Sequence, residues 1–155
     1  MSKVVYTGGT FDLFHTGHVN LLKACREIAG KKGKVVVGLN DDDFVARYKG
    51  KPPVIDYINR TEVLLACRYV DEVVGNTGGL DSKPVILEVK PKYIVIGSDW
   101  ARKDYYKQMD FTQDWLDEMG ITLVYVPYTK YISSTVIKER LKNETGNSNS
   151  TPSGK

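Results

Sequence analysis

The sequence has few of the residues that build metal clusters, disulfide frameworks or membrane anchors. Its 155 residues include two cysteines and two histidines. The cysteines, Cys25 and Cys67, lie in amphipathic helical patterns without Cys-x-x-Cys spacing, so we interpret both as buried thiols. No apolar run approaches the roughly 18 residues of a membrane span, and the first residues lack the long apolar stretch of a secretory signal. These absences predict a cytoplasmic protein that has no membrane partner.

A strong charge of one sign is also missing. Lysine and arginine number 22 against 19 acidic residues, which gives a formal charge of +3. The basic residues are scattered along the chain, so the small excess argues against a nucleic-acid partner. Small anionic ligands, held by a few placed cations, remain compatible with this balance.

What is present points to one ordinary globular domain with a polar tail. The length lies close to the roughly 150 residues typical of one domain, and 41% of the residues are hydrophobic. Residues 143–155 contain no large apolar side chain and cannot offset the entropy of ordering. We therefore predict a single domain over residues 1–142 and a disordered tail over 143–155.

Short apolar runs alternate with helical patterns. Strands are predicted at 4–6, 35–39, 93–97 and 121–126, because such short β-branched runs suit strands buried on both faces. Apolar residues at helical spacing lie between them, most clearly at 21–29 and 63–70, with shorter helices predicted at 42–47, 84–89, 112–119 and 134–141. The alternation predicts an α/β fold with an open parallel sheet, and a ligand where strand carboxyl ends meet helix N-termini.

The turn after the first strand is rich in glycine and contains both histidines. Gly8 and Gly9 are adjacent, which differs from the Gly-x-Gly-x-x-Gly dinucleotide fingerprint. His15 and His18 are three residues apart, so both rings can project to the same side of a helix start. A metal site would need at least a third ligand. The pattern therefore favours two donors to a phosphate at a helix N-terminus, with capping as the structural alternative.

These residues carry a family resemblance. Gly9-Thr10-Phe11-Asp12 followed by His15-Thr16-Gly17-His18 resembles the nucleotidyltransferase superfamily, and within it the glycerol-3-phosphate cytidylyltransferases in particular. The resemblance covers Lys3 to Leu141 and implies a Rossmann-like open parallel sheet with helices on both faces. It also implies transfer of CMP from CTP to a phosphorylated alcohol such as glycerol 3-phosphate, with release of pyrophosphate, Mg²⁺ accompanying the nucleotide, and a homodimer.

The resemblance also assigns roles to individual residues. Those with an implied catalytic role are His15, His18, Lys49 and Arg68. Those implied to bind the nucleotide are Gly9, Thr10, Phe11, His15, His18, Lys51, Asp99, Thr129, Ser133, Ser134 and Thr135. Lys49 and Lys83 are implied to bind the acceptor, and no residue is assigned to a metal. The role of Arg60 is left open: it is either a functional residue or an exposed residue at a helix start.

One segment departs from the family pattern and leaves the nucleotide open between CTP and ATP. Cytidylyltransferases of this kind read Arg-Thr-Glu-Gly where this chain reads Tyr128-Thr129-Lys130-Tyr131. A cation is missing there, and Lys130 or Arg102 is a candidate replacement. The alternatives are an adenylyltransferase acting on a sugar phosphate or riboflavin phosphate, and a nucleotide-binding module without catalysis.

Overall fold

A parallel β-sheet forms the centre of the molecule in the computed structural model, which describes residues 3–76 and 81–150. Its five strands are β1 (Val4–Gly9), β2 (Lys34–Leu39), β3 (Glu72–Gly75), β4 (Tyr93–Gly97) and β5 (Thr122–Val126). They lie in the order β3-β2-β1-β4-β5, and every neighbouring pair is parallel. The predicted Rossmann-like open parallel sheet is confirmed.

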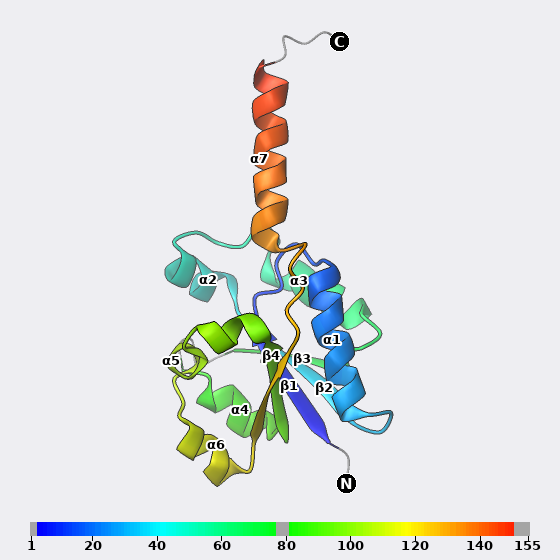
Figure 1. Ribbon diagram of the computed structural model, residues 1–155, viewed down its shortest axis with the longest axis vertical. Coiled ribbons are helices and arrows are strands. Elements are labelled where there is room, and N and C mark those ends of the chain that lie inside the picture. The colour runs from blue at the N-terminus through cyan, green and yellow to red at the C-terminus, as the bar shows by residue number, and fades with distance from the viewer. Residues whose placement is uncertain (1–2, 77–80, 151–155) are drawn as a thin grey trace.

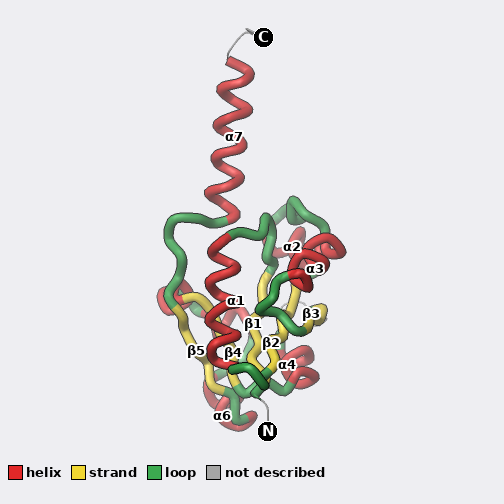
Figure 2. The backbone as a smooth tube through the Cα atoms, turned by 90° about the vertical axis from the view of Figure 1, so that its right-hand side faces the viewer, coloured by secondary structure: helices red, strands yellow, loops and turns green. Residues whose placement is uncertain are grey.

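Helices cover both faces of the sheet (Figures 1 and 2). Side chains of α1 (Thr16–Ala29) and α3 (Tyr57–Ala66) pack with one face, where Leu22 and Leu64 share a core cluster. On the other face lie α4 (Lys83–Val89), α5 (Tyr105–Met109) and α6 (Gln113–Met119), whose buried side chains share a cluster with Tyr6. Val5, the residue before Tyr6, packs on the α1 side, because successive side chains of a strand point to opposite faces.

The chain reverses its direction across the sheet between β1 and β4. After β1 it continues through α1 to β2 on one side, whereas β4 pairs with the other side of β1. The connections that follow β1 and β4 leave in opposite directions across the sheet, so a crevice is expected outside the carboxyl ends of these two strands. Gly9 and Gly97 are the last residues of the two strands and flank that crevice.

The last helix extends further than predicted. α7 spans Ser134–Ser150 and projects away from the sheet (Figure 1). Residues 143–150 are therefore helical where an irregular tail was expected, and residues 151–155 lie outside the described part of the chain. Once a first turn exists, each added residue gains a backbone hydrogen bond, which allows a polar segment to continue a helix. Within residues 3–76 and 81–150, no helix combines the length and hydrophobicity that crossing a bilayer requires.

The two cysteines differ in burial. Cys25 is fully buried on α1, as predicted, and burial raises the pKa of its thiol to about 12. Cys67 is half-buried, because α3 ends at Ala66 and Cys67 caps it in an extended conformation. The prediction of two buried thiols is thus wrong for Cys67.

Candidate functional site

A cavity of about 710 Å³ lies at the carboxyl edge of the sheet. It is lined by the loops that follow β1, β2, β4 and β5, by the starts of α1 and α7, and by α2 (Asp42–Lys49) and α5. This volume is within the roughly 300–1,000 Å³ of typical small-molecule sites. The cavity occupies the crevice that the strand order predicts.

The two histidines stack at the start of α1, with ring centroids 3.8 Å apart, and both line the cavity. His15 caps the helix, and its Nδ1 accepts a hydrogen bond from the Gly17 N–H at 3.0 Å. His18 Nδ1 accepts from the His15 N–H at 3.2 Å. A Cβ on Gly17 would lie 2.8 Å from His15 Cε1, so glycine is needed for this close approach. Because both Nδ1 atoms are acceptors, the proton of each neutral ring is on Nε2.

The surroundings keep this pair neutral. The pKa of His18 is lowered to about 3, chiefly by burial and also by the neighbouring His15, while Asp12 opposes both effects. Burial also lowers the pKa of His15. At neutral pH the site therefore offers two uncharged imidazoles, each with one Nε2–H donor.

Two helix N-termini open onto the same cavity. One is the start of α1, and the other is the start of α7, where Ser133 Oγ accepts from the Val136 N–H at 3.1 Å. Ser134 Oγ donates to the Asp12 carbonyl oxygen at 2.6 Å, which joins the start of α7 to the turn after β1. Helix N-termini carry unpaired N–H groups and a positive dipole end, so this arrangement suits a polyphosphate.

Asp12 organises the turn, although sequence reasoning gave it no role. Its buried carboxylate accepts from the N–H groups of Leu13, Val54 and Ile55 at 2.8–3.1 Å and lies 3.8 Å from Lys138 Nζ. Leu13 has φ 52°, as does Phe11, so Asp12 stands between two left-handed residues in a strained turn. The sequence feature that could have indicated this role is the acidic residue at the end of the Gly-Thr-Phe-Asp motif. Its carboxylate fixes the loop after α2 against β1.

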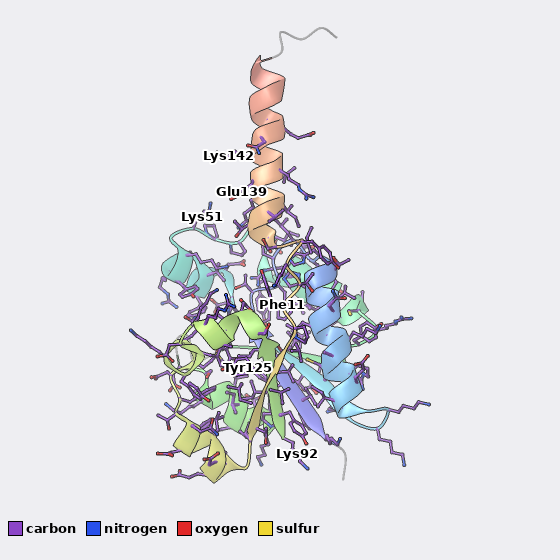
Figure 3. All side chains as sticks on the ribbon, in the orientation of Figure 1. Phe11, Lys51, Lys92, Tyr125, Glu139 and Lys142 are labelled. Carbon is purple, nitrogen blue, oxygen red and sulfur yellow. The ribbon has the colours of Figure 1, made fainter. Side chains whose placement is uncertain are left out.

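Lys49 is the predicted lysine that reaches the cavity. It is the last residue of α2, and its pKa is lowered by burial and by Lys138, with Asp12 opposing. Lys51 is exposed on the outer loop that follows α2 (Figure 3) and does not line the cavity. Lys83 Nζ lies 3.5 Å from Asp81 Oδ1, and Lys83 is not among the residues that line the cavity.

Arg68 lies at the opposite edge of the sheet. It belongs to the loop that precedes β3, and in a parallel sheet such loops lie at the amino ends of the strands. Its guanidinium is exposed and donates to the Tyr69 hydroxyl at 3.0 Å, an interaction that raises its pKa. In the same segment Asp71 pairs with Arg26 and accepts from the Val35 N–H. The structure does not bring Arg68 to the cavity, contrary to its predicted catalytic place.

Arg60 is buried rather than exposed. Its guanidinium donates to the carbonyl oxygens of Ile55, Thr10 and Asn40 at 2.7–2.9 Å and pairs with Asp42 at 2.7 Å. One side chain therefore connects α3 to the loops after β1 and β2 and to the start of α2. The sequence gave no sign of this, because these partners are up to 50 residues away and three of them are backbone carbonyls.

The wall at the end of β4 supplies aromatic and charged groups. Asp99 and Tyr128 both pack against Gly97, where a Cβ would lie 2.7 Å from Asp99 Oδ1. Lys103 Nζ lies 3.7 Å from Asp99 and 5.1 Å from the centre of the Trp100 ring. All five residues line the cavity, whereas Arg102 and Lys130 do not. Lys103 therefore places a cation in this wall, which neither Lys130 nor Arg102 does.

The structure brings most of the predicted site together. The predicted residues that line the cavity are Gly9, Thr10, Phe11, His15, His18, Lys49, Asp99, Thr129, Ser133 and Ser134. Those that do not line it are Lys51, Arg68, Lys83 and Thr135. Thr135, the second residue of α7, is exposed. The lining also includes Asn40, Tyr48, Asn76, Lys103, Gln108 and Tyr128, which carried no predicted role.

Comparisons with known proteins agree with this geometry. A family model described as cytidylyltransferase-like matches residues 6–140. The chain is 34% identical over 139 residues to glycerol-3-phosphate cytidylyltransferase of Bacillus subtilis, which covers 90% of this chain and 97% of the relative. It is 40% identical over 95 residues to FAD synthase of Pyrococcus horikoshii, covering 61% of this chain and only 62% of the relative's length. A crystal structure of a lipopolysaccharide core biosynthesis protein from Thermoplasma volcanium superposes with a TM-score of 0.66 at 29% identity, over 85% of this chain and all of that one.

Proposed function

The chain belongs to the cytidylyltransferase-like family, and on that premise we propose that it transfers a nucleotidyl group, CMP from CTP in the first instance, to a phosphorylated alcohol with release of pyrophosphate. The observation that carries this proposal is the stacked His15–His18 pair at the N-terminus of α1. Two Nε2–H donors beside two helix N-termini form a site for a triphosphate.

The chemistry asks little of the protein beyond position and charge. An acceptor that is a phosphate monoester brings its own anionic oxygen, so no side chain needs to be activated as a nucleophile. The acceptor oxygen must be aligned with the α-phosphorus, and the charge that builds on the leaving pyrophosphate must be stabilised. His15 and His18 donate hydrogen bonds to the phosphates, and Lys49 adds a positive charge. Asp12 and Ser134 hold these groups in place by fixing the turn and the start of α7.

Mg²⁺ enters this proposal as part of the nucleotide substrate. Within the described residues no group of three or more histidine, cysteine, aspartate or glutamate side chains could hold a metal ion. Mg²⁺ is commonly bound by substrate phosphates and water with few protein ligands. We therefore treat Mg²⁺ as bound by the phosphates of the nucleotide and by water.

Glycerol 3-phosphate is the first acceptor to test. It is supported by the B. subtilis relative, whose alignment extends over nearly its whole length. The assay measures pyrophosphate release with CTP and glycerol 3-phosphate and identifies the nucleotide product by mass spectrometry. Release that requires both substrates supports transfer. A protein that binds CTP but releases nothing with any acceptor would instead be a binding module.

Adenylyl transfer is a second candidate, favoured by Tyr128. An aromatic ring stands in the cavity wall where the cytidylyltransferase pattern has arginine, and the P. horikoshii relative is named as an FAD synthase. Replacing CTP by ATP in the same assay, with riboflavin phosphate and sugar phosphates as acceptors, decides between the two nucleotides. The homodimer that the family resemblance implies stays a prediction, which light scattering on the purified chain measures.

A further inference from the structure

The floor of the cavity contains a tyrosine, Tyr6, which neither the family motif nor the phosphate-binding groups account for. Tyr6 is the third residue of β1, and its ring belongs to the core cluster on the α4, α5 and α6 face of the sheet. The residue is only 1% exposed, yet it lines the cavity. A buried tyrosine usually gives its hydroxyl a hydrogen-bond partner, so the surroundings of this hydroxyl indicate what it does.

Two paired glycines make room for the Tyr6 hydroxyl. Gly8 of β1 and Gly38 of β2 are register partners, two residues beyond Tyr6 and its own partner Val36. A Cβ on Gly38 would lie 1.9 Å from the Tyr6 hydroxyl oxygen, and a Cβ on Gly8 would lie 3.0 Å from it. The phenol therefore lies along the sheet, leans from β1 over β2, and points toward the carboxyl edge, where Gly8 also lines the cavity. Any side chain at position 38 would displace it.

The hydroxyl has no partner in the protein. Among the residues that the structure describes, none forms a hydrogen bond with the Tyr6 hydroxyl. Burial raises the pKa of Tyr6, so the phenol keeps its proton at neutral pH and can donate it to a hydrogen bond. The Tyr105 hydroxyl also lacks a partner in the same part of the chain, but its oxygen is enclosed by the core and out of reach of a ligand. An unpaired buried hydroxyl is costly, which makes the one that faces a cavity a candidate ligand contact.

The position of the hydroxyl indicates which substrate it meets. In the strand order, β2 and β4 lie on opposite sides of β1, and the phenol leans toward β2. The stacked histidines begin α1 on the other face of the sheet, and α7 follows β5 on the far side of β4. The hydroxyl is thus turned away from the groups that suit the triphosphate and toward the end of β2, the strand that precedes α2 and its last residue, Lys49.

We propose that the Tyr6 hydroxyl contacts the acceptor substrate by donating a hydrogen bond to one of its oxygen atoms, which holds the acceptor over the carboxyl ends of β1 and β2. This role rests on the nucleotidyl transfer proposed above and adds a residue to it. Lys103 and Asp104 also line the cavity at the start of α5, and their charges are opposite. A neutral hydrogen bond, rather than net charge, therefore distinguishes the contribution of Tyr6.

The first measurement asks whether the hydroxyl serves the fold. Tyr6→Phe removes the hydroxyl and keeps the ring in the core. Because no hydrogen bond within the protein is lost, the variant should unfold at the same temperature as wild type or at a higher one. A fall in Tm of more than about 3 °C would show that the hydroxyl stabilises the folded chain, and would overturn the proposal.

The second measurement is steady-state pyrophosphate release with the active pair of nucleotide and acceptor, beginning with CTP and glycerol 3-phosphate. Tyr6→Phe should lower kcat/KM for the acceptor about 10-fold, the effect of one hydrogen bond, and leave the KM of the nucleotide unchanged. The control is Tyr93→Phe on the neighbouring strand β4, because Tyr93 packs on the α1 face and does not line the cavity. An unchanged kcat/KM for the acceptor, a rise in the nucleotide KM, or the same loss in Tyr93→Phe overturns the proposal.

A binding measurement separates the role of Tyr6 from the proposed reaction. If no acceptor gives pyrophosphate with CTP or ATP, nucleotidyl transfer fails, and thermal-shift titration with glycerol 3-phosphate and riboflavin phosphate tests the contact alone. The larger of the two stabilisations should shrink in Tyr6→Phe and be kept in Tyr93→Phe. Equal stabilisation of wild type and Tyr6→Phe, or no stabilisation by either compound, overturns the contact.

Discussion

Replacing Arg60 by alanine should lower the free energy of unfolding by about 3–5 kcal/mol, the usual cost of breaking a buried ion pair. The side chain is 1% exposed and makes four hydrogen bonds, to three carbonyl oxygens and to Asp42. Alanine leaves the three carbonyl oxygens without this donor, and each unsatisfied buried group costs about 1–3 kcal/mol. The Asp42 carboxylate is partly exposed and keeps the hydrogen bond from the Tyr57 N–H. Water that enters the vacated space offsets part of the cost of these unsatisfied groups, so we expect a loss of about 3–5 kcal/mol rather than their full sum.

The measurement is urea unfolding followed by circular dichroism, with thermal unfolding beside it. For a chain of this length a loss of 3–5 kcal/mol corresponds to a fall in Tm of about 6–20 °C. Arg60→Lys should lie between wild type and alanine, because an ammonium keeps the charge but cannot reproduce the guanidinium fork. Arg68→Ala is the matched control and should leave the midpoint unchanged, since Arg68 is exposed. An Arg60→Ala chain within 1 kcal/mol of wild type would refute this interpretation of the network.

Three further predictions concern the cavity. His18→Ala should reduce kcat about 10²–10³-fold, as expected for one preorganised donor, and a fully active variant would remove His18 from the mechanism. The pKa of His18 in the folded chain, about 3, lies below its ordinary value of 6.5, so between these values the unfolded chain binds more protons. The urea midpoint should therefore fall as the pH drops from 6.5 toward 4, more steeply in wild type than in His18→Asn. Parallel pH profiles of the two proteins would contradict the burial of His18. Lys49→Met should lower kcat/KM about 10- to 100-fold, the effect of losing one charged hydrogen bond, while Lys51→Met should stay near wild type. Equal losses of kcat/KM in steady-state assays would show that lining the cavity does not distinguish the function of Lys49 from that of Lys51.

Local patterns were sufficient for most of the fold. The apolar run at 35–39 became β2 and the apolar spacing at 21–29 became the inner face of α1. A strand buried on both faces shows a short continuous apolar run, whereas a helix buried on one face shows apolar residues at a period of 3.6. The short helices η1 (Ser98–Arg102) and α5 were not predicted. They have only five residues each, too few to show a period, and Tyr105 is buried through contacts with the sheet rather than through a helical stripe.

The site divides in the same way. The residues around His15 and His18 could be placed from sequence, because they lie in one continuous turn and its helix start. Arg68 could not, since its loop precedes β3 and so lies at the amino edge of the sheet. Lys83 starts α4 after β3, but its ammonium lies near Asp81 and Asp110 instead of in the cavity lining. Lys103 and Gln108 were missed because each is an ordinary polar residue until α5 folds against the ends of β4 and α2.

By itself, the sequence determined that a parallel α/β sheet carries a glycine-rich, two-histidine turn at a helix start, since these features are set by neighbours within a few residues. Tertiary structure alone decided that Asp12 and Arg60 tie that turn to distant loops, that Arg68 stands at the far edge, and that Tyr48 meets Gln108 across the cavity. The physical reason is distance along the chain: these contacts join segments about 40 to 60 residues apart, and no local period or propensity records them.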